Sequence, residues 1–306
     1  MIIPNQLKKD DIVLVVAASG SIKEKDREYI EKSTKMLEDL GLKVEFSKSA
    51  YSNKTGYGAT ILEKAEDINE GFRNPKYQML FIVKGGGNSN SLFDYLDYEL
   101  IKNNPKIVCG FSDSTSITNM ITEKTGLVTY SGPTFKSLSS WETDYGYRSF
   151  IKRFIKADLE LAEEDDKFVT IQEGKAVGEL MGGNLSLIAR MVAGKYNINF
   201  DNKILFIEEL GFESEPAICS GNLYYLKQNG VFDKIKGIWI GNYEHEDGIQ
   251  LEKILLDALA NEYNFPIIKS NNFGHTDRKT IIPIGTIAKI DTEKEIKIEL
   301  LEKCVK

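Results

Sequence analysis

The sequence reads Ile107-Val108-Cys109-Gly110-Phe111-Ser112-Asp113-Ser114-Thr115 at the point that decides its fold class. The run up to Phe111 is apolar and strand-sized, and the apolar residues after the turn recur at the spacing of one helix face. A strand that turns directly into a helix is typical of a parallel α/β sheet. The turn would hold the Ser112 hydroxyl at the edge of that sheet.

This turn allows two interpretations. A nucleophile elbow presents a serine hydroxyl in this way, and the amide that follows it, with the helix N-terminus, favours a developing oxyanion. However, the segment from Gly110 to Ser114 lacks the second glycine of the Gly-x-Ser-x-Gly elbow. A helix cap formed by Ser112 or Asp113 is therefore the competing interpretation.

The first half of the chain repeats the strand–helix pattern. Apolar runs at residues 12–18, 43–46 and 79–84 predict strands, and an amphipathic stretch at 26–40, closed by Gly41, predicts a helix. This order predicts a Rossmann-like N-terminal domain with a parallel sheet. The carboxyl ends of parallel strands share one edge, where open α/β sheets bind ligands.

The second half predicts a smaller C-terminal domain of mixed α/β structure. The pattern weakens between residues 137 and 174, so we expect an N-terminal domain at 1–160 and a C-terminal domain at 161–306. The acidic run 160–166 is interpreted as a solvated connector. Beyond it, Gly182-Gly183-Asn184 predicts a turn between a strand and a helix.

Charge and cysteine content exclude several classes of protein. The formal charge of −7 argues against a nucleic-acid surface, because phosphate binding requires concentrated Lys and Arg. The three cysteines form neither a paired framework nor a metal cluster, and their odd number fits a reducing compartment. The first residues lack the pattern of a leader, and the apolar runs are too short to cross a membrane. We therefore expect a cytoplasmic protein that binds neither nucleic acid nor membrane.

A glycine-rich turn follows the strand that ends near residue 83. It reads Lys84-Gly85-Gly86-Gly87-Asn88-Ser89-Asn90 and precedes a stretch at 91–97 that predicts a helix. Adjacent glycines let backbone amides approach a ligand and form an anion-binding nest. The turn lacks both the Gly-Lys-Ser/Thr ending of a P-loop and the Gly-x-Gly-x-x-Gly spacing of a dinucleotide fold. A nucleotide cofactor is therefore disfavoured.

A serine nucleophile needs a base, and the chain contains two histidines. His275 lies in a polar loop between apolar runs, where catalytic side chains are commonly displayed. His245 stands between two glutamates and is interpreted as solvated, so His275 is the preferred base. Glu208 and Glu209 follow a buried strand and should point to opposite faces, so one of them would reach the imidazole.

Taken in order, these segments resemble the LD-carboxypeptidase family, and more specifically its microcin C immunity branch. The resembling blocks are residues 84–92, 95–97, 109–115, 131–133, 178–185, 205–209, 273–276 and 282–285. The blocks span most of the chain, and their shared order is more specific than any single motif. The resemblance therefore adds weight to the catalytic interpretation.

The resemblance also implies which residues act. Ser112, in the Gly-x-Ser-Asp turn, would be the nucleophile, His275 the base and Glu208 the third member of the triad. The backbone amides of Gly86 and Asp113 would form the oxyanion hole. The same resemblance implies a site between the two domains and no metal or organic cofactor. It leaves a homodimer open, because family members are often dimers.

The predicted function is a serine peptidase that hydrolyses an amide bond in a small peptide-like substrate. The family's carboxypeptidases release D-alanine from a murein tetrapeptide, whereas the immunity branch cleaves an aminoacyl-nucleotide amide. The block 87–90 is similar to the immunity branch. No tryptophan stands between Glu142 and Met181, where that branch has its nucleotide-stacking tryptophan, and Phe168 is the candidate substitute. Lys84 stands where the carboxypeptidases usually have arginine.

Two other functions stay open at this point. The cleft between the domains could bind a peptide or a nucleotide without catalysis, with Ser112 as a helix cap. A nucleotide-dependent transferase would use the glycine turn and would bind ATP or NAD. Labelling of Ser112 by a serine-directed fluorophosphonate separates the enzyme from the binding module.

Overall fold

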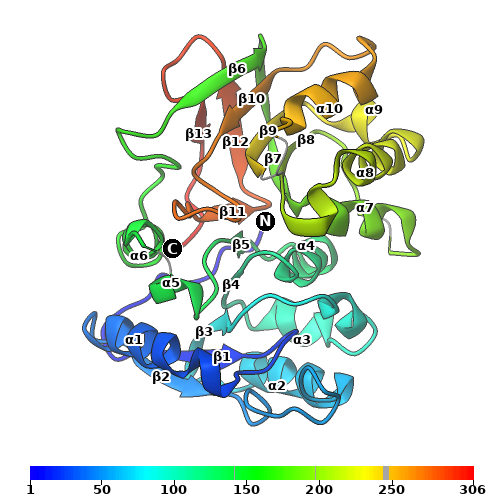
Figure 1. Ribbon diagram of the computed structural model, residues 1–306. Coiled ribbons are helices and arrows are strands. Elements are labelled where there is room, and N and C mark those ends of the chain that lie inside the picture. The colour runs from blue at the N-terminus through cyan, green and yellow to red at the C-terminus, as the bar shows by residue number, and fades with distance from the viewer. Residues whose placement is uncertain (141, 197, 244–247) are drawn as a thin grey trace.

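The computed structural model describes residues 1–306 except 141, 197 and 244–247. Two β-sheets, each flanked by helices, form the lower and upper halves of the molecule in Figure 1. The lower sheet is built mainly from the first half of the chain and the upper sheet from the second half. The predicted fold class, an α/β protein with a parallel N-terminal sheet and a mixed C-terminal one, is confirmed.

The N-terminal sheet has six strands in the order β11-β5-β4-β3-β1-β2. Five are mutually parallel, and β11 is antiparallel to β5. Along β1, Val13 and Val15 pack into one core cluster while Leu14 and Val16 pack into another, so both faces of the sheet are covered. The strands are β1 (Ile12–Val16), β2 (Lys43–Phe46), β3 (Tyr77–Ile82), β4 (Ile107–Gly110), β5 (Thr129–Ser131) and β11 (Ile282–Ile284).

Helices lie on both faces of this sheet (Figure 1). Helix α2 shows how local sequence defines an end: Thr60 and Glu63 form a reciprocal capping box at its N-terminus. The elements are η1 (Glu24–Asp26), α1 (Arg27–Glu38), α2 (Ile61–Arg73), η2 (Ser89–Leu92), α3 (Tyr98–Asn103), α4 (Ser114–Thr125), α5 (Ser137–Ser140), α6 (Tyr145–Phe150) and the π-helical turn η3 (Ile151–Ile155).

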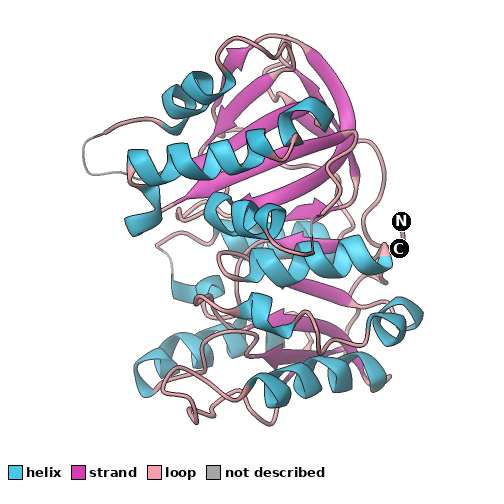
Figure 2. Ribbon diagram, turned by 90° about the vertical axis from the view of Figure 1, so that its right-hand side faces the viewer, coloured by secondary structure: helices cyan, strands magenta, loops and turns pink. Residues whose placement is uncertain are grey.

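The C-terminal sheet has seven strands in the order β13-β12-β7-β8-β9-β10-β6. Strands β7 to β10 are parallel, and the others pair antiparallel at the two edges, so the sheet is mixed and visibly curled in Figure 2. The strands are β6 (Phe168–Gln172), β7 (Lys175–Asn184), β8 (Lys203–Glu209), β9 (Gly237–Tyr243), β10 (Ile267–Ser270), β12 (Ile287–Asp291) and β13 (Ile298–Leu300). The helices are α7 (Leu185–Ala193), η4 (Gly211–Ser214), α8 (Pro216–Gln228), α9 (Val231–Lys234) and α10 (Leu251–Leu259).

Two local expectations are wrong. Gly182-Gly183-Asn184 is not a turn: these residues extend β7 and pair with β8, and Asn184 then caps α7. A side chain on Gly182 would overlap the Phe206 backbone, so the glycine serves close strand packing. The helix expected at 91–97 is instead the short turn η2, followed by α3, because Asp97 accepts from the Leu100 amide and starts a new helix there.

Buried polar contacts join the two halves of the molecule. Asn119 on α4 donates to the Gly182 carbonyl at 2.8 Å and accepts from the Gly182 amide at 3.1 Å. Thr115 Oγ1 accepts from the Asn184 amide at 3.1 Å. Helix α4 is therefore fastened to strand β7 of the other sheet.

Replacing Asn119 by alanine should lower the free energy of unfolding by about 1–3 kcal/mol, because it leaves buried groups of Gly182 without a partner. Urea unfolding followed by fluorescence measures this change. In Asn229→Ala an exposed asparagine is removed whose side chain, among the described residues, donates to the Tyr225 carbonyl at the end of α8 and to no other group, so the free energy of unfolding should change by no more than about 0.5 kcal/mol. Equal effects of the two substitutions would contradict the role of Asn119 in joining α4 to β7.

The end of the chain returns to the N-terminal half. The Cys304 carbonyl accepts a hydrogen bond from Tyr130, and the Lys306 amide donates to the Pro4 carbonyl at 3.0 Å.

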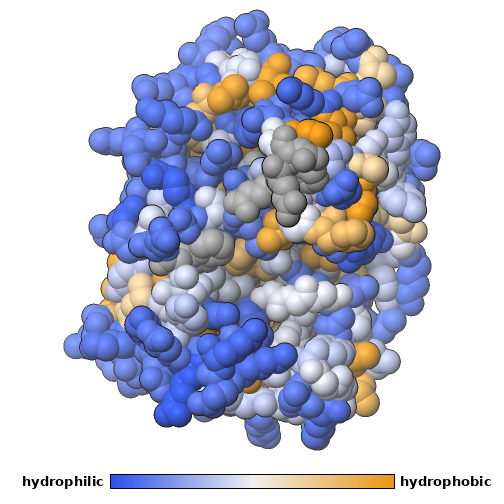
Figure 3. Space-filling view, in the orientation of Figure 1, coloured by the Kyte–Doolittle hydropathy of each residue, from blue (hydrophilic) through white to orange (hydrophobic). Residues whose placement is uncertain are grey.

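Hydrophilic residues cover most of the face in Figure 3, with apolar patches mainly in its upper half. None of the described helices combines the length and the apolar character that crossing a bilayer requires. All three cysteines are buried and unpaired.

Candidate active site

Ser112 occupies a strained turn between β4 and α4. Its φ is +60°, in the left-handed region that residues with a side chain seldom adopt. Gly110 allows the turn to close, since a Cβ there would lie 2.8 Å from Ser114 Oγ. Backbone strain of this kind is typical of functional sites. The turn therefore has the conformation of a nucleophile elbow without its second glycine.

The glycine turn packs directly over this elbow. A Cβ on Gly85 would lie 3.1 Å from Ser112 Oγ, so the backbone of the turn passes beside the hydroxyl. The Asp113 carboxylate accepts from the amides of Asn88 and Ser89, each at 2.9 Å. The Ser89 hydroxyl donates back to the Asp113 carbonyl. These bonds hold the two backbone segments in a fixed relation.

Two amide donors are left open at this junction. Within the described part of the chain, neither the Gly86 N–H nor the Asp113 N–H donates to a protein acceptor. A side chain on Gly86 would overlap the Ser19 hydroxyl, which accepts from the Gly87 amide at 3.1 Å. Unpaired amides beside a strained serine are suited to stabilise an oxyanion.

The imidazole of His275 is held by a carboxylate and a ring. Its Nδ1 lies 2.6 Å from Glu208 Oε2, and its centroid lies 4.9 Å from that of Phe111, the neighbour of Ser112. The side chains of His275 and Glu208 are only 13% and 4% exposed. With Nδ1–H donating to Glu208, Nε2 is left as an acceptor, which is the tautomer a general base needs.

The residue before the histidine must be glycine. Gly274 has φ +98°, and a Cβ there would lie 2.8 Å from Glu208 Cβ. The loop backbone therefore approaches the carboxylate more closely than a side chain would allow.

Glu209 turns away from His275. Its carboxylate accepts from Asn184 Nδ2 at 2.6 Å, from the Ser186 amide at 2.9 Å and from the Leu210 amide at 3.0 Å. It thereby caps the start of α7. Burial, and secondarily the charge of Glu208, raises the pKa of Glu209. The two adjacent glutamates thus serve different elements, as strand alternation predicts.

A narrow pocket joins these segments at the carboxyl ends of the strands. It is lined by Phe111, Ser112, Thr115, Ser131, Gly132, Glu208, Phe273, Gly274, Lys279 and Thr280. The structure thus brings together Ser112, Glu208 and the loop of His275. The alternative base, His245, lies outside the described residues.

Sequence reasoning missed Lys279 in the pocket wall. This lysine is 2% exposed, and its ammonium donates to the Gly274 carbonyl at 2.5 Å and lies 4.0 Å from the Phe111 ring centroid. It therefore supports the two residues that flank the catalytic candidates. Its position four residues after His275 is the one signal that could have pointed to it.

Lys84, at the start of the glycine turn, belongs to an ion cluster around the buried Asp26. Its Nζ lies 2.6 Å from Asp26 Oδ2, and Lys136 Nζ lies 2.8 Å from Asp26 Oδ1. Burial alone would raise the pKa of Asp26, but the hydrogen bonds from Lys136 and Lys84 outweigh it and lower the pKa to about 2. The cluster therefore ties Lys84, the first residue of the glycine turn, to Asp26 at the end of η1.

This cluster predicts an acid-sensitive contribution to stability. At pH values above the ordinary pKa of 3.8, the ionised Asp26 contributes about 2 kcal/mol to the free energy of unfolding. This contribution is lost as the pH falls toward 2 and the carboxylate is protonated. Asp26→Asn should therefore be less stable than the native chain at pH 7, and the difference should shrink between pH 4 and pH 2. Denaturant unfolding at several pH values measures it, and a difference that does not change with pH would contradict the assignment.

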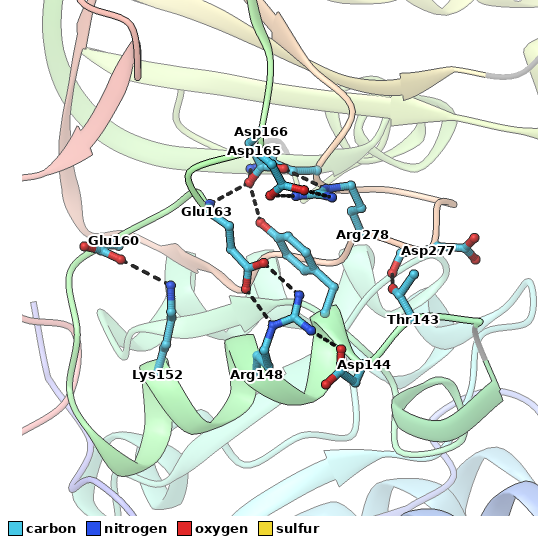
Figure 4. A network of polar contacts seen from close by, with 12 residues as sticks. Thr143, Asp144, Arg148, Lys152, Glu160, Glu163, Asp165, Asp166, Asp277 and Arg278 are labelled. Atoms are coloured by element: carbon cyan, nitrogen blue, oxygen red, sulfur yellow. Dashed lines mark hydrogen bonds and ion pairs between the residues drawn. The ribbon is translucent and has the colours of Figure 1, made fainter.

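The acidic run is more than a solvated connector, so this expectation is wrong in part (Figure 4). Asp166 is 8% exposed and accepts from Tyr145 OH at 2.6 Å. Glu163 pairs with Arg148, and Asp165 pairs with Arg278, the third residue after His275. Leu161 and Ala162, the two apolar residues of the run, are buried and were the signal that this segment packs against the protein, whereas burial of the Asp166 carboxylate depends on partners distant in the sequence.

Phe168 does not line the pocket. It begins β6 and packs against the core cluster of the C-terminal sheet. The expectation that it substitutes for a nucleotide-stacking tryptophan therefore lacks support from its position. Trp141 lies outside the described residues.

Comparison with known proteins assigns the chain to a family. Residues 13–132 match the LD-carboxypeptidase N-terminal domain, and residues 177–290 match the LD-carboxypeptidase C-terminal domain. The chain belongs to the LD-carboxypeptidase family. The predicted enzyme class, a serine hydrolase of this family, is confirmed.

Three known proteins illustrate what this member of the LD-carboxypeptidase family is similar to. A probable murein peptide carboxypeptidase from Bacillus subtilis (strain 168) is 30% identical, covering 97% of this chain and 94% of that protein. The microcin C7 self-immunity protein MccF of Escherichia coli is 27% identical, covering 91% of this chain and 89% of that protein. The crystal structure of an MccF-like protein from Bacillus anthracis str. Ames has a TM-score of 0.88 at 31% identity, covering 99% and 100% of the two chains.

Proposed function

We propose that this LD-carboxypeptidase family member hydrolyses an amide bond with Ser112 as nucleophile, His275 as general base and Glu208 as the orienting carboxylate. The amides of Gly86 and Asp113 serve as oxyanion donors. The observation that carries the proposal is the 2.6 Å contact between His275 Nδ1 and Glu208 Oε2, because Glu208 lines the same pocket as the strained Ser112.

The reaction follows from these roles. His275 Nε2 takes the Ser112 proton while Oγ attacks the amide carbon, and the two backbone amides stabilise the tetrahedral oxyanion. Collapse of this intermediate breaks the carbon–nitrogen bond, and the imidazolium returns the proton to the departing amine. Water, deprotonated by His275, then hydrolyses the acyl ester and restores the Ser112 hydroxyl. Glu208 stabilises the imidazolium in both steps.

A murein-type peptide is the substrate class that we favour. The two aromatic residues of the pocket wall already have partners: Phe111 packs against His275 and Lys279, and Phe273 is buried against Trp239. Neither ring is therefore placed to stack on the base of a nucleotide. The similarity to the Bacillus subtilis murein peptide carboxypeptidase supports the same class. An aminoacyl-nucleotide amide is the second candidate, favoured by the similarity to MccF and to the MccF-like structure.

Product analysis separates these substrates. The protein is incubated with murein tetrapeptide and with a panel of aminoacyl-sulfamoyl adenosines, and products are followed by mass spectrometry. Release of D-alanine supports the carboxypeptidase, and release of an amino acid from the adenosine panel supports the second candidate. Binding of either compound without turnover would contradict catalysis and support a binding module.

The proposal extends to the location, the assembly and the domain limits of the protein. Three buried, unpaired cysteines support a cytoplasmic location. A homodimer and a domain boundary at residue 160 stay predictions. Sedimentation equilibrium tests the first, and limited proteolysis across the connector tests the second.

A further inference from the structure

The loop that carries the proposed base, residues 271–280, is fastened at both ends to the connector between the sheets. At its start, Asn272 donates to the Leu161 carbonyl at 3.0 Å and to Asp166 Oδ2 at 3.1 Å. At its end, Arg278 Nε donates to Asp166 Oδ1 at 2.8 Å, as Figure 4 shows. One buried carboxylate therefore contacts both ends of the loop.

The carboxylate of Asp166 is fully hydrogen-bonded. Besides the two loop residues, it accepts from Tyr145 OH at 2.6 Å and from the Glu163 amide at 2.7 Å, and its side chain is 2% exposed. Burial, and then the bond to Asp166, raises the pKa of Tyr145, which therefore remains a donor. Among the described residues, four donors and no acceptor contact this carboxylate. An asparagine in its place would turn its own NH₂ group toward at least one of these donors.

The neighbouring carboxylate differs in its surroundings. Asp165 is 70% exposed and pairs with the outer nitrogens of the same guanidinium of Arg278. Exposed ion pairs of this kind contribute about 0–1 kcal/mol. Asp165 and Asp166 thus offer a matched pair of substitutions around one arginine.

We propose that Asp166 is a positioning residue for catalysis, which holds the loop so that the His275 imidazole stays between Glu208 and Ser112. The inference rests on the proposed function, because it gives His275 the role of base. Glu208 holds one ring nitrogen, Asn242 donates to the carbonyls of Phe273 and His275, and Lys279 donates to the Gly274 carbonyl. The Asp166 bonds act in addition to these, on both ends of the loop.

The physical reason is geometric. Proton transfer requires the base within hydrogen-bond reach of the hydroxyl, and a displacement of about 1 Å at such a site costs about 100-fold in rate. Loss of the Asp166 bonds would remove one hydrogen bond from each end of the loop at once, leaving Asn272 held by the Leu161 carbonyl and Arg278 by the exposed Asp165. The loop would then sample positions in which the imidazole no longer reaches Ser112, although no group that touches the substrate has changed.

The test compares Asp166→Asn with Asp165→Asn in the full chain. The rate at which a fluorophosphonate labels Ser112 should fall at least tenfold in Asp166→Asn and stay within about twofold in Asp165→Asn. The labelled fraction should still reach completion in a single phase, which separates a slow folded enzyme from a partly unfolded sample. Hydrogen exchange in the peptide that spans 271–280 should become faster in Asp166→Asn alone.

A second substitution guards against a misfolded variant. Arg278→Lys keeps the charge beside Asp166 but loses the planar fork, and it should give an intermediate labelling rate. Native protein that labels, together with an unchanged rate in Asp166→Asn, would overturn the positioning role and leave the proposed function intact. Native protein that does not label would overturn both.

Discussion

Replacing Ser112 by alanine should lower the rate of amide hydrolysis by a factor on the order of 10⁴–10⁶, the largest effect expected of any single substitution in this chain. The reason is that the hydroxyl forms the covalent acyl intermediate, and no other group of the pocket replaces it. Substrate binding should change little, because alanine removes one oxygen atom and leaves the elbow in place. Steady-state release of product, measured by mass spectrometry on the better substrate of the panel, gives the rate.

The matched control for this substitution is Ser114→Ala, two residues further along the same turn. The Ser114 hydroxyl is buried and has no hydrogen-bond partner in the described part of the chain, so its removal should leave the rate within about threefold. A Ser112→Ala variant that retains more than a tenth of the native rate would remove the covalent mechanism from consideration.

Glu208→Gln should lower kcat by a factor on the order of 10³–10⁴ with a much smaller change in KM. The carboxylate accepts the Nδ1–H of His275 at 2.6 Å and so selects the tautomer whose Nε2 can take a proton. A glutamine can present its amide NH₂ group to the ring, which stabilises the wrong tautomer, and it cannot stabilise the imidazolium. Pre-steady-state kinetics should show that acylation is the slowed step.

Glu209→Gln provides the comparison within the same strand. Glu209 is as deeply buried as Glu208, but its partners are Asn184 and the backbone at the start of α7. This variant should lose stability, by about 1–3 kcal/mol, and keep kcat within a few-fold. If the two substitutions lowered kcat equally, the assignment of Glu208 alone to the imidazole would be wrong.

Much of the sheet architecture was predictable because it depends on local apolar runs. Strand β2 occupies residues 43–46, as predicted, and β1 and β4 differ from prediction by one or two residues at their ends. Gly182-Gly183-Asn184 was misassigned because glycine usually marks a turn, whereas here Gly182 permits close packing against the Phe206 backbone. The sequence of β7 alone does not reveal its neighbour in space.

The candidate site was predictable where one segment carried its own signal. Ser112 stands in a strand-to-helix turn, and His275 stands in a polar loop between apolar runs. The choice of Glu208 over Glu209 required the family resemblance, because alternation alone does not say which face meets the histidine. Lys279 and Asp166 were not identified, since each acts through contacts with residues distant in the sequence.

The most direct test of the central claim is to react the native protein with a fluorophosphonate and to map the modified residue by peptide mass spectrometry. The account predicts one modified residue, Ser112, and loss of labelling in His275→Ala under the same conditions. A folded native protein that is not labelled, or one labelled at another serine while Ser112 stays free, would contradict it.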